Sequence, residues 1–255
     1  MTSIAQGPGV ARRFRRLFCL GLLLACAGAG GAVSPDALFH DGSAAYRTAD
    51  YARAAEAFRA AAGQQPAVGT LHNLGNAEWR CGRVGEAIIA WEQALWLNPF
   101  DPSSRNNLRL ARANVQLEAP ELAWYEVSST WLPPDAWAWI TSASLWLVAG
   151  AVTLPGILRR RKTGWDQALA AAGLTVLLLT LPAHVGAHTR SRLGFVLAKN
   201  APLRLTPTQD AQAVTRLAAG EPGRVERTRG AYLLIRTSRA SGWVLREEFG
   251  LVCGR

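Results

Sequence analysis

The sequence predicts a multi-domain membrane protein built from helical hairpins, two transmembrane helices and a small all-β barrel. Three observations predict it: a spacing of 33 residues that recurs early in the chain, two long stretches without charge, and short apolar runs between turn residues after residue 190. The 255 residues allow one to three domains at about 100–200 residues each. Charged residues make up 18%, below the roughly 25% typical of soluble proteins, which indicates a chain that lies partly outside water.

The net charge of +10 is unevenly distributed along the chain. Residues 1–34 carry +4, residues 35–134 carry −3, residues 135–189 carry +2 and residues 190–255 carry +7. Much of the basic charge lies in short clusters beside apolar runs, which is the pattern of membrane topology signals and not of a nucleic-acid surface. We therefore expect a lipid bilayer and no nucleic acid as a partner.

Residues 1–32 are typical of an export signal. Arginines at 12, 13, 15 and 16 precede the apolar stretch Leu17–Ala27, and small residues follow as far as Ala32. The apolar stretch is too short to cross a bilayer, which favours a signal peptide. The segment Leu23–Cys26 also resembles a bacterial lipobox, which would make Cys26 a lipidation site. Both a simple and a lipoprotein-type signal remain open.

Residues 35–117 are predicted to form helical hairpins, because five positions recur 33 residues later. Small residues let paired helices approach, an aromatic side chain fills the space between hairpins, and proline stops the second helix. The pattern resembles the tetratricopeptide repeat (TPR), with repeats at about 35–67 and 68–101 and a capping helix over 102–117 whose N-cap would be Ser103 or Ser104. The recurring residues are Gly42, Ala54, Phe58, Ala61 and Pro66, then Gly75, Ala87, Trp91, Ala94 and Pro99.

The TPR resemblance implies a concave face that binds an extended peptide. Asparagine amides pair with a peptide backbone and arginine pairs with carboxylates, which gives this face a chemical reason to bind. The alternative is a solvated or self-packed surface. The residues that the resemblance assigns to this face are Ser43, Tyr46, Arg47, His72, Asn76, Trp79, Arg80 and Asn106.

Two charge-free stretches predict transmembrane helices. After a linker over residues 118–135, residues 136–158 would form a helix of roughly 34 Å, longer than the ~30 Å hydrocarbon core, with Trp137 and Trp139 at the interface. Residues 167–189 form the second stretch. Buried core helices are the alternative, but neither stretch has a polar face.

The loop between these stretches fixes the expected topology. Residues 159–166 include Arg159, Arg160, Arg161 and Lys162, and short basic loops stay in the cytoplasm. Both flanking domains then lie on the outer side, where an export signal would also send the chain. The sequence thus predicts a two-pass protein of a bacterial inner membrane with both domains in the periplasm.

Residues 194–252 predict a small barrel, because six short β-type runs follow one another about every ten residues. The segment resembles a bacterial SH3 domain, most specifically at Gly242-Trp243-Val244. In a segment of about 60 residues, one barrel uses the whole hydrophobic core, so we expect no catalytic pocket. Its charge favours an acidic partner, and the acidic helical domain is itself a candidate. The expected surface residues are Arg224, Arg227, Arg229, Tyr232 and Trp243, with ordinary surface charge as the alternative.

The sequence contains no motif of a common enzyme class. It has no phosphate-binding loop, dinucleotide fingerprint, nucleophile elbow or zinc-protease motif, so we expect no enzyme and no cofactor. His184 and His188 stand four residues apart, but two ligands are too few for a structural metal site. Cys81 and Cys253, outside the signal, would meet an oxidising compartment either as a disulfide or as free thiols.

The order of these parts is more specific than any one of them. A signal, two TPR motifs, two spans joined by a basic loop and a C-terminal SH3-like domain together resemble the BatE family of aerotolerance operons. This resemblance implies a non-enzymatic scaffold in an envelope or oxidative-stress system, acting with von Willebrand A domain membrane proteins and a MoxR-type ATPase. A lipid on Cys26 would depart from that family. The alternative is an anchor that binds peptidoglycan through the SH3-like domain.

Overall fold

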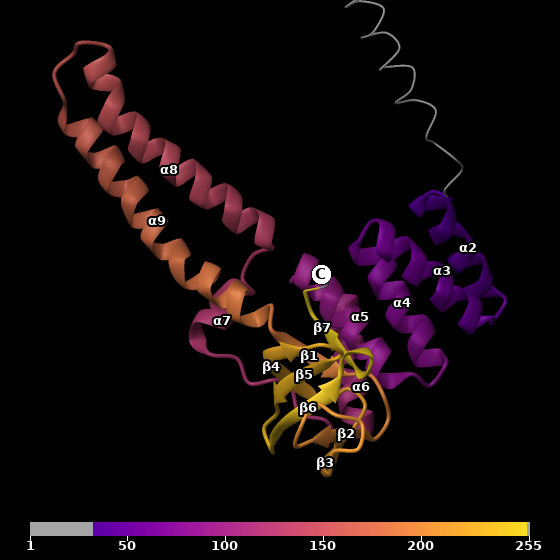
Figure 1. The fold of residues 1–255 in the computed structure, drawn as a ribbon. Helices are drawn as coiled ribbons and strands as arrows, with labels where there is room; N and C mark the ends of the chain where they lie inside the picture. Colours follow the sequence, from indigo (N-terminus) through magenta and orange to yellow (C-terminus); the bar gives the residue numbers. More distant parts are fainter. Residues whose placement is uncertain (1–32, 254–255) are drawn as a thin grey trace, which may run out of the picture.

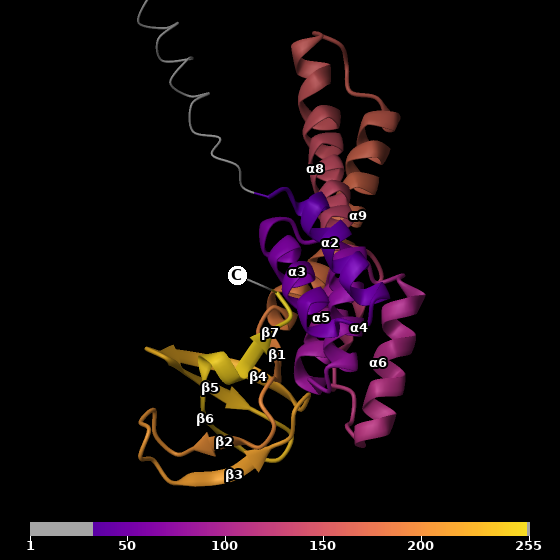
Figure 2. The same ribbon diagram turned by 90° about the vertical axis from the view of Figure 1, so that its right-hand side faces the viewer.

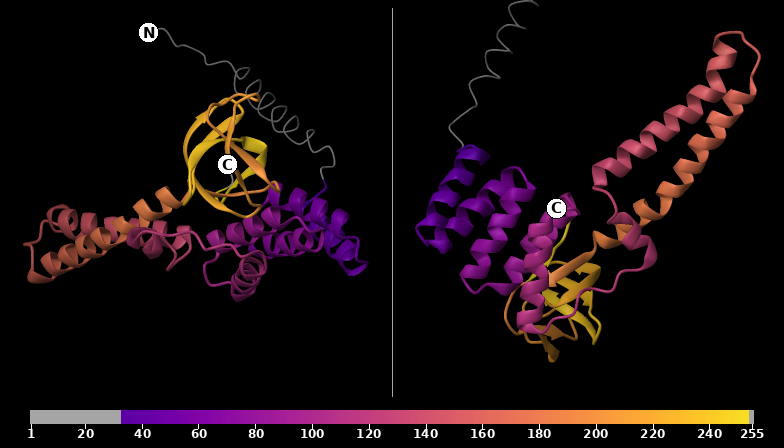
Figure 3. Two further views of the ribbon diagram at one scale, coloured as in Figure 1. Left: turned by 90° about the horizontal axis from the view of Figure 1, so that it is seen from below. Right: turned by 180° about the vertical axis from the view of Figure 1, so that it is seen from behind.

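In a computed structural model, residues 33–253 form eight α-helices and one antiparallel sheet (Figure 1). The signal predicted for residues 1–32 and the lipidation site proposed at Cys26 lie outside these described residues. The β domain sits between the helical hairpins and a long pair of apolar helices (Figure 3). The coarse prediction of hairpins, two long apolar helices and a C-terminal β domain is therefore confirmed.

The helical part repeats with the predicted period. Every boundary of the second hairpin lies 33 residues after the matching boundary of the first, and a fifth helix packs against the end of the stack. That helix begins at residue 102, as predicted, but its N-cap is Asp101 and not Ser103 or Ser104: the Asp101 carboxylate accepts from the Ser104 N–H at 3.0 Å. The helices are α2 (Pro35–Arg47), α3 (Tyr51–Gln64), α4 (Val68–Arg80), α5 (Val84–Leu97) and α6 (Pro102–Val115).

The repeat is held by an aromatic ring placed against a glycine in each hairpin. A Cβ atom added to Gly42 would lie 2.9 Å from the Phe58 ring, and one added to Gly75 would overlap the Trp91 indole. Phe58 and Trp91 are almost fully buried. The close approach predicted at the two glycines is therefore confirmed, since any side chain at either glycine would push the two helices of its hairpin apart. The aromatic rings were expected between hairpins, and these contacts lie within each hairpin.

Two long helices project from the rest of the molecule as an antiparallel pair (Figure 1). They are α8 (Pro134–Ile157) and α9 (Gly164–Arg190), and both are long and apolar enough to cross a membrane. Only 11% and 17% of their most apolar segments are buried, so they are not core helices of this structure. The preceding segment, expected to be a linker, contains a short helix, α7 (Trp124–Ser129), that packs against α9.

The C-terminal domain is a curled sheet of seven antiparallel strands in the order β3-β2-β6-β5-β4-β1-β7 (Figure 2). The first six correspond to the six predicted runs, and the seventh was not predicted. Their inward side chains, among them Leu203, Ile235 and Val244, form a core of their own. The strands are β1 (Leu193–Val196), β2 (Ala201–Arg204), β3 (Ala213–Leu217), β4 (Pro222–Arg229), β5 (Tyr232–Arg236), β6 (Ser241–Leu245) and β7 (Phe249–Leu251).

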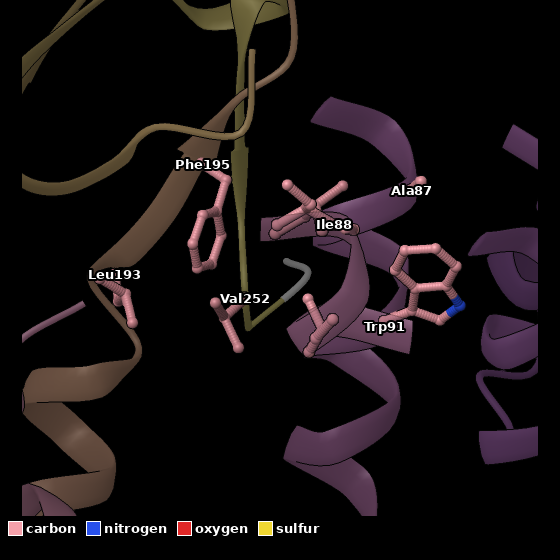
Figure 4. Packing of buried hydrophobic residues seen from close by; sticks show 9 residues of the cluster. Ala87, Ile88, Trp91, Leu193, Phe195 and Val252 are labelled. Carbon is pink, nitrogen blue, oxygen red and sulfur yellow. The ribbon is translucent and has the colours of Figure 1, made fainter. Parts of the chain in front are cut away.

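A second core joins the β domain to the helical hairpins (Figure 4). Ile88 and Trp91 of α5 pack in one buried cluster with Phe195 of β1 and with Val252, just after β7. The Gln93 amide adds a hydrogen bond to the Leu251 carbonyl at 3.0 Å. The expectation that the helical domain is a partner of the β domain is met by this contact, but the contact is mainly apolar and not ionic.

We expect Gly75→Ala to lower the free energy of unfolding by about 1–3 kcal/mol, because the added methyl group overpacks the α4–α5 contact. Chemical denaturation of the full chain in detergent, followed by circular dichroism, measures the change. Gly69→Ala is the matched control in the same helix, because a Cβ there meets nothing within 4 Å. Equal stability of the two variants would contradict the packing role of Gly75.

Candidate functional sites

Two of the predicted peptide-binding residues, His72 and Asn76, form a polar network between α4 and α6. The Asn76 amide contacts His72 Nε2 at 3.0 Å, and His72 Nδ1 contacts Ser104 Oγ at 3.0 Å. The Asn76 carbonyl accepts from Asn107 Nδ2 at 2.7 Å and from Trp91 Nε1 at 3.3 Å. Most of the hydrogen-bonding capacity of His72 and Asn76 is thus used inside the protein.

This environment favours the uncharged form of His72. Burial lowers the pKa of His72 below its usual value, and Asp101, whose carboxylate lies 4.0 Å from Nδ1, only partly opposes that effect. If the Asn76 amide donates to Nε2, the single ring proton lies on Nδ1 and is donated to Ser104. The network therefore suits a neutral structural contact more than the capture of an acidic ligand.

A second cluster consists of Tyr46 near the end of α2, Tyr51 at the start of α3 and Arg80 at the end of α4, and it reaches the surface. The two tyrosine rings meet edge to face with centroids 5.2 Å apart. Arg80 donates to the Tyr51 hydroxyl at 2.6 Å, and its guanidinium lies 4.6 Å from that ring centroid. Arg47 is exposed next to Tyr46. This tyrosine–arginine cluster presents aromatic faces and cationic groups, which suit a peptide with acidic side chains.

The other residues predicted for the concave peptide-binding face lie outside these two clusters. Ser43 donates to the Phe39 carbonyl of its own helix at 2.8 Å, and Trp79 packs beside Trp91 against the interdomain core. Asn106 is exposed and accepts a hydrogen bond from Arg109. Tyr51, Ser104 and Asn107 complete the two clusters and were not predicted as site residues.

The β domain brings its five predicted surface residues to one face of the sheet. Strand register places Arg229 opposite Tyr232, and Arg227 opposite Leu234, which in turn lies opposite Trp243. Directly opposed residues share a face, so Arg227, Arg229 and the half-buried Trp243 form one basic and aromatic surface, which we call the outer β face. Tyr232 lies on the same side of the sheet but is buried, so its prediction as a surface residue was wrong. The Tyr232 hydroxyl is buried and has no hydrogen-bond partner among residues 33–253.

Arg224 belongs to this face by register but is not available for a ligand. It forms two hydrogen bonds with the buried carboxylate of Glu126 in α7, at 2.6 and 2.7 Å, and a third with the Glu121 carbonyl at 3.1 Å. Burial alone would raise the pKa of Glu126, but Arg224 and the Ala123 N–H outweigh it and hold that pKa below its usual value. The pair therefore stays ionised and ties α7 to the β domain.

No metal-ligating or redox cluster stands out in the described part of the chain. Within residues 33–253, no group of three or more His, Cys, Asp or Glu side chains is arranged to hold a metal ion. His184 Nε2 contacts Thr141 Oγ1 at 2.6 Å, and His188 is exposed. Cys81 and Cys253 are both free.

The chain matches no protein-family model and no curated protein sequence.

We expect the Glu126–Arg224 pair to make the stability of the fold fall as the pH becomes acidic. Because the folded-state pKa of Glu126 is depressed, the pair contributes fully above the ordinary carboxyl pKa of about 4.3, and the contribution is lost as pH falls through the depressed value. Arg224→Gln should cost about 2 kcal/mol at pH 7 and flatten the fall in stability below pH 5. Denaturation curves measured between pH 7 and pH 3 check both effects.

Arg227→Gln is the control for charge alone, because Arg227 is exposed on the same strand. In this variant, the loss of stability as the pH falls should be the same as in the unmodified chain. An Arg224→Gln profile parallel to that of Arg227→Gln would show that the pair does not determine the acid response.

Proposed function

We propose that this protein is a non-enzymatic, membrane-anchored scaffold for protein–protein interaction, similar to the BatE family. The observation that carries the proposal is the shared core of Ile88, Trp91, Phe195 and Val252, which joins the hairpins to the β domain. Two membrane-length helices extend from this joined body. A body of this kind holds two surfaces at fixed positions above a membrane, which is what a scaffold requires.

The finer assignments belong to the same proposal. The 33-residue offset of all four helix boundaries supports TPR repeats, and seven short antiparallel strands around one small core support an SH3-like domain. The hairpins and the β domain meet the same end of the α8–α9 pair, while the basic loop Arg159–Lys162 lies at the other end (Figure 1). This arrangement supports a two-pass inner-membrane protein with both domains in the periplasm.

The proposed partners are von Willebrand A domain membrane proteins of an aerotolerance system that includes a MoxR-type ATPase. Their docking surface on this chain is the tyrosine–arginine cluster with Arg47. Arg47 is exposed, so its guanidinium can pair with a carboxylate, and Arg80 has donors beyond the one given to Tyr51. Asn76 is a poor target for mutagenesis, because its side chain supports His72, Trp91 and Asn107 inside the fold.

The experiment is crosslinking in intact membranes followed by mass spectrometry, comparing the unmodified chain with Arg47→Glu/Arg80→Glu. We expect the double variant to lower crosslinks to von Willebrand A proteins by about tenfold or more, because placing like charges together costs several kcal/mol and each 1.4 kcal/mol is tenfold. The matched control is Arg227→Glu/Arg229→Glu, which changes charge equally on the outer β face. Equal crosslinking by both variants would remove the tyrosine–arginine cluster as the docking surface.

The second candidate function is a cell-wall anchor that binds peptidoglycan through the SH3-like domain. The outer β face favours it, because the aromatic Trp243 lies there beside the exposed Arg227 and Arg229. Sedimentation of the detergent-solubilised full chain with purified peptidoglycan tests it with the same pair of variants. Loss of sedimentation in Arg227→Glu/Arg229→Glu alone would favour the anchor, and a chain that stays in solution at physiological salt would exclude it.

A further inference from the structure

The short helix α7 and the turn after it expose large apolar side chains. Trp124 is 73% exposed, Val127 is 41% exposed and Trp131 is 63% exposed. The polar residues of the same segment are turned inward: Glu126, Ser128 and Ser129 are buried. A surface helix in water shows the opposite arrangement, with polar groups outside and apolar groups inside.

The buried polar groups of α7 are satisfied by the protein. Glu126 is paired with Arg224 of the β domain, and Ser129 Oγ accepts from Arg190 Nη1 at 3.1 Å. Ser128 donates to the Tyr125 carbonyl at 2.7 Å. Since the contacts of Glu126 with Arg224 and of Ser129 with Arg190 fix which side of α7 faces the protein, they also place Trp124, Val127 and Trp131 on the side that faces away from it.

The position of α7 along α8 and α9 is also fixed. A Cβ added to Gly186 would overlap the Tyr125 carbonyl, so α7 lies directly against α9 one turn before α9 ends at Arg190. The chain then passes through Trp131 and enters α8 at Pro134. The exposed side chains of α7 therefore lie level with the outer ends of both membrane-length helices.

We propose that residues 124–131 lie in the headgroup region of the outer leaflet, with Trp124, Val127 and Trp131 inserted among the lipids. Tryptophan is enriched at this depth because its ring is apolar and its N–H is polar. A short amphipathic segment can lie in the plane of the interface with its apolar side toward the acyl chains. The occupant of this apolar surface is thus the bilayer that α8 and α9 are proposed to cross, and the inference rests on that part of the proposed function.

This placement gives α7 a role in positioning the β domain. The bilayer would hold the apolar side of α7, and the Glu126–Arg224 pair joins its polar side to β4. Without α7, the β domain would be connected to the membrane only through the end of α9. With it, the β domain is held at two points and so at a defined height.

The test measures the depth of labelled cysteines in the full chain, reconstituted in vesicles of phosphatidylcholine and phosphatidylglycerol. Single cysteines replace Val127, Trp131, Leu145 or Leu110, the native cysteines being serine, and each carries a fluorophore. Nitroxide lipids quench from either the headgroup or the middle of the acyl chain. Val127→Cys leaves both tryptophans in place, and circular dichroism checks that each variant is folded.

We expect the labels at 127 and 131 to be quenched most by the headgroup nitroxide. The label at 145, exposed in the middle of α8, should be quenched most by the acyl-chain nitroxide, and the label at 110, exposed on α6, by neither. Quenching at 145 without quenching at 127 and 131 would overturn the interfacial placement and leave the membrane anchor intact. A label at 145 that neither lipid quenches would overturn the anchor itself.

Discussion

The apolar contact between α5 and the first and last strands determines how the whole molecule is assembled. Fully burying a side chain such as Ile88, Phe195 or Val252 contributes about 1.5–3 kcal/mol, whereas the single hydrogen bond between Gln93 and Leu251 contributes about 1 kcal/mol. The β domain is therefore held on the hairpins mainly by packing. Because this contact is made by α5, it leaves the tyrosine–arginine cluster of α2, α3 and α4 uncovered by the β domain.

The parts of the fold that follow from local chemistry were predictable from the sequence. The 33-residue period comes from residues that contact each other within one repeat, such as Gly75 and Trp91. Because these contacts are local, the sequence pattern alone predicts them. Length and absence of charge similarly predicted α8 and α9. Most strands followed from apolar runs between turn residues, whereas the three residues of β7 are too few to give such a signal.

The interdomain core and α7 were not predictable, because both depend on contacts between residues far apart in the chain. Ile88 looks like an ordinary helix residue until Phe195, more than 100 positions later, covers it. Glu126 looks like a solvent-exposed charge in a linker until Arg224 pairs with it. In α6 the predicted site residue was wrong by one position, because Asn107 and not Asn106 contacts α4. The N-cap of α6 is Asp101, ahead of both serines proposed for that role.

The β domain is attached to the rest of the chain by two contacts of different chemistry, which respond to different conditions. The apolar contact with α5 does not depend on ionisation, whereas the contact with α7 requires a charged Glu126. Acid that protonates Glu126 weakens only the second contact. The hairpins and the β domain are then still joined by the apolar core, so acid affects the link between the β domain and α7 more than the link between the two domains.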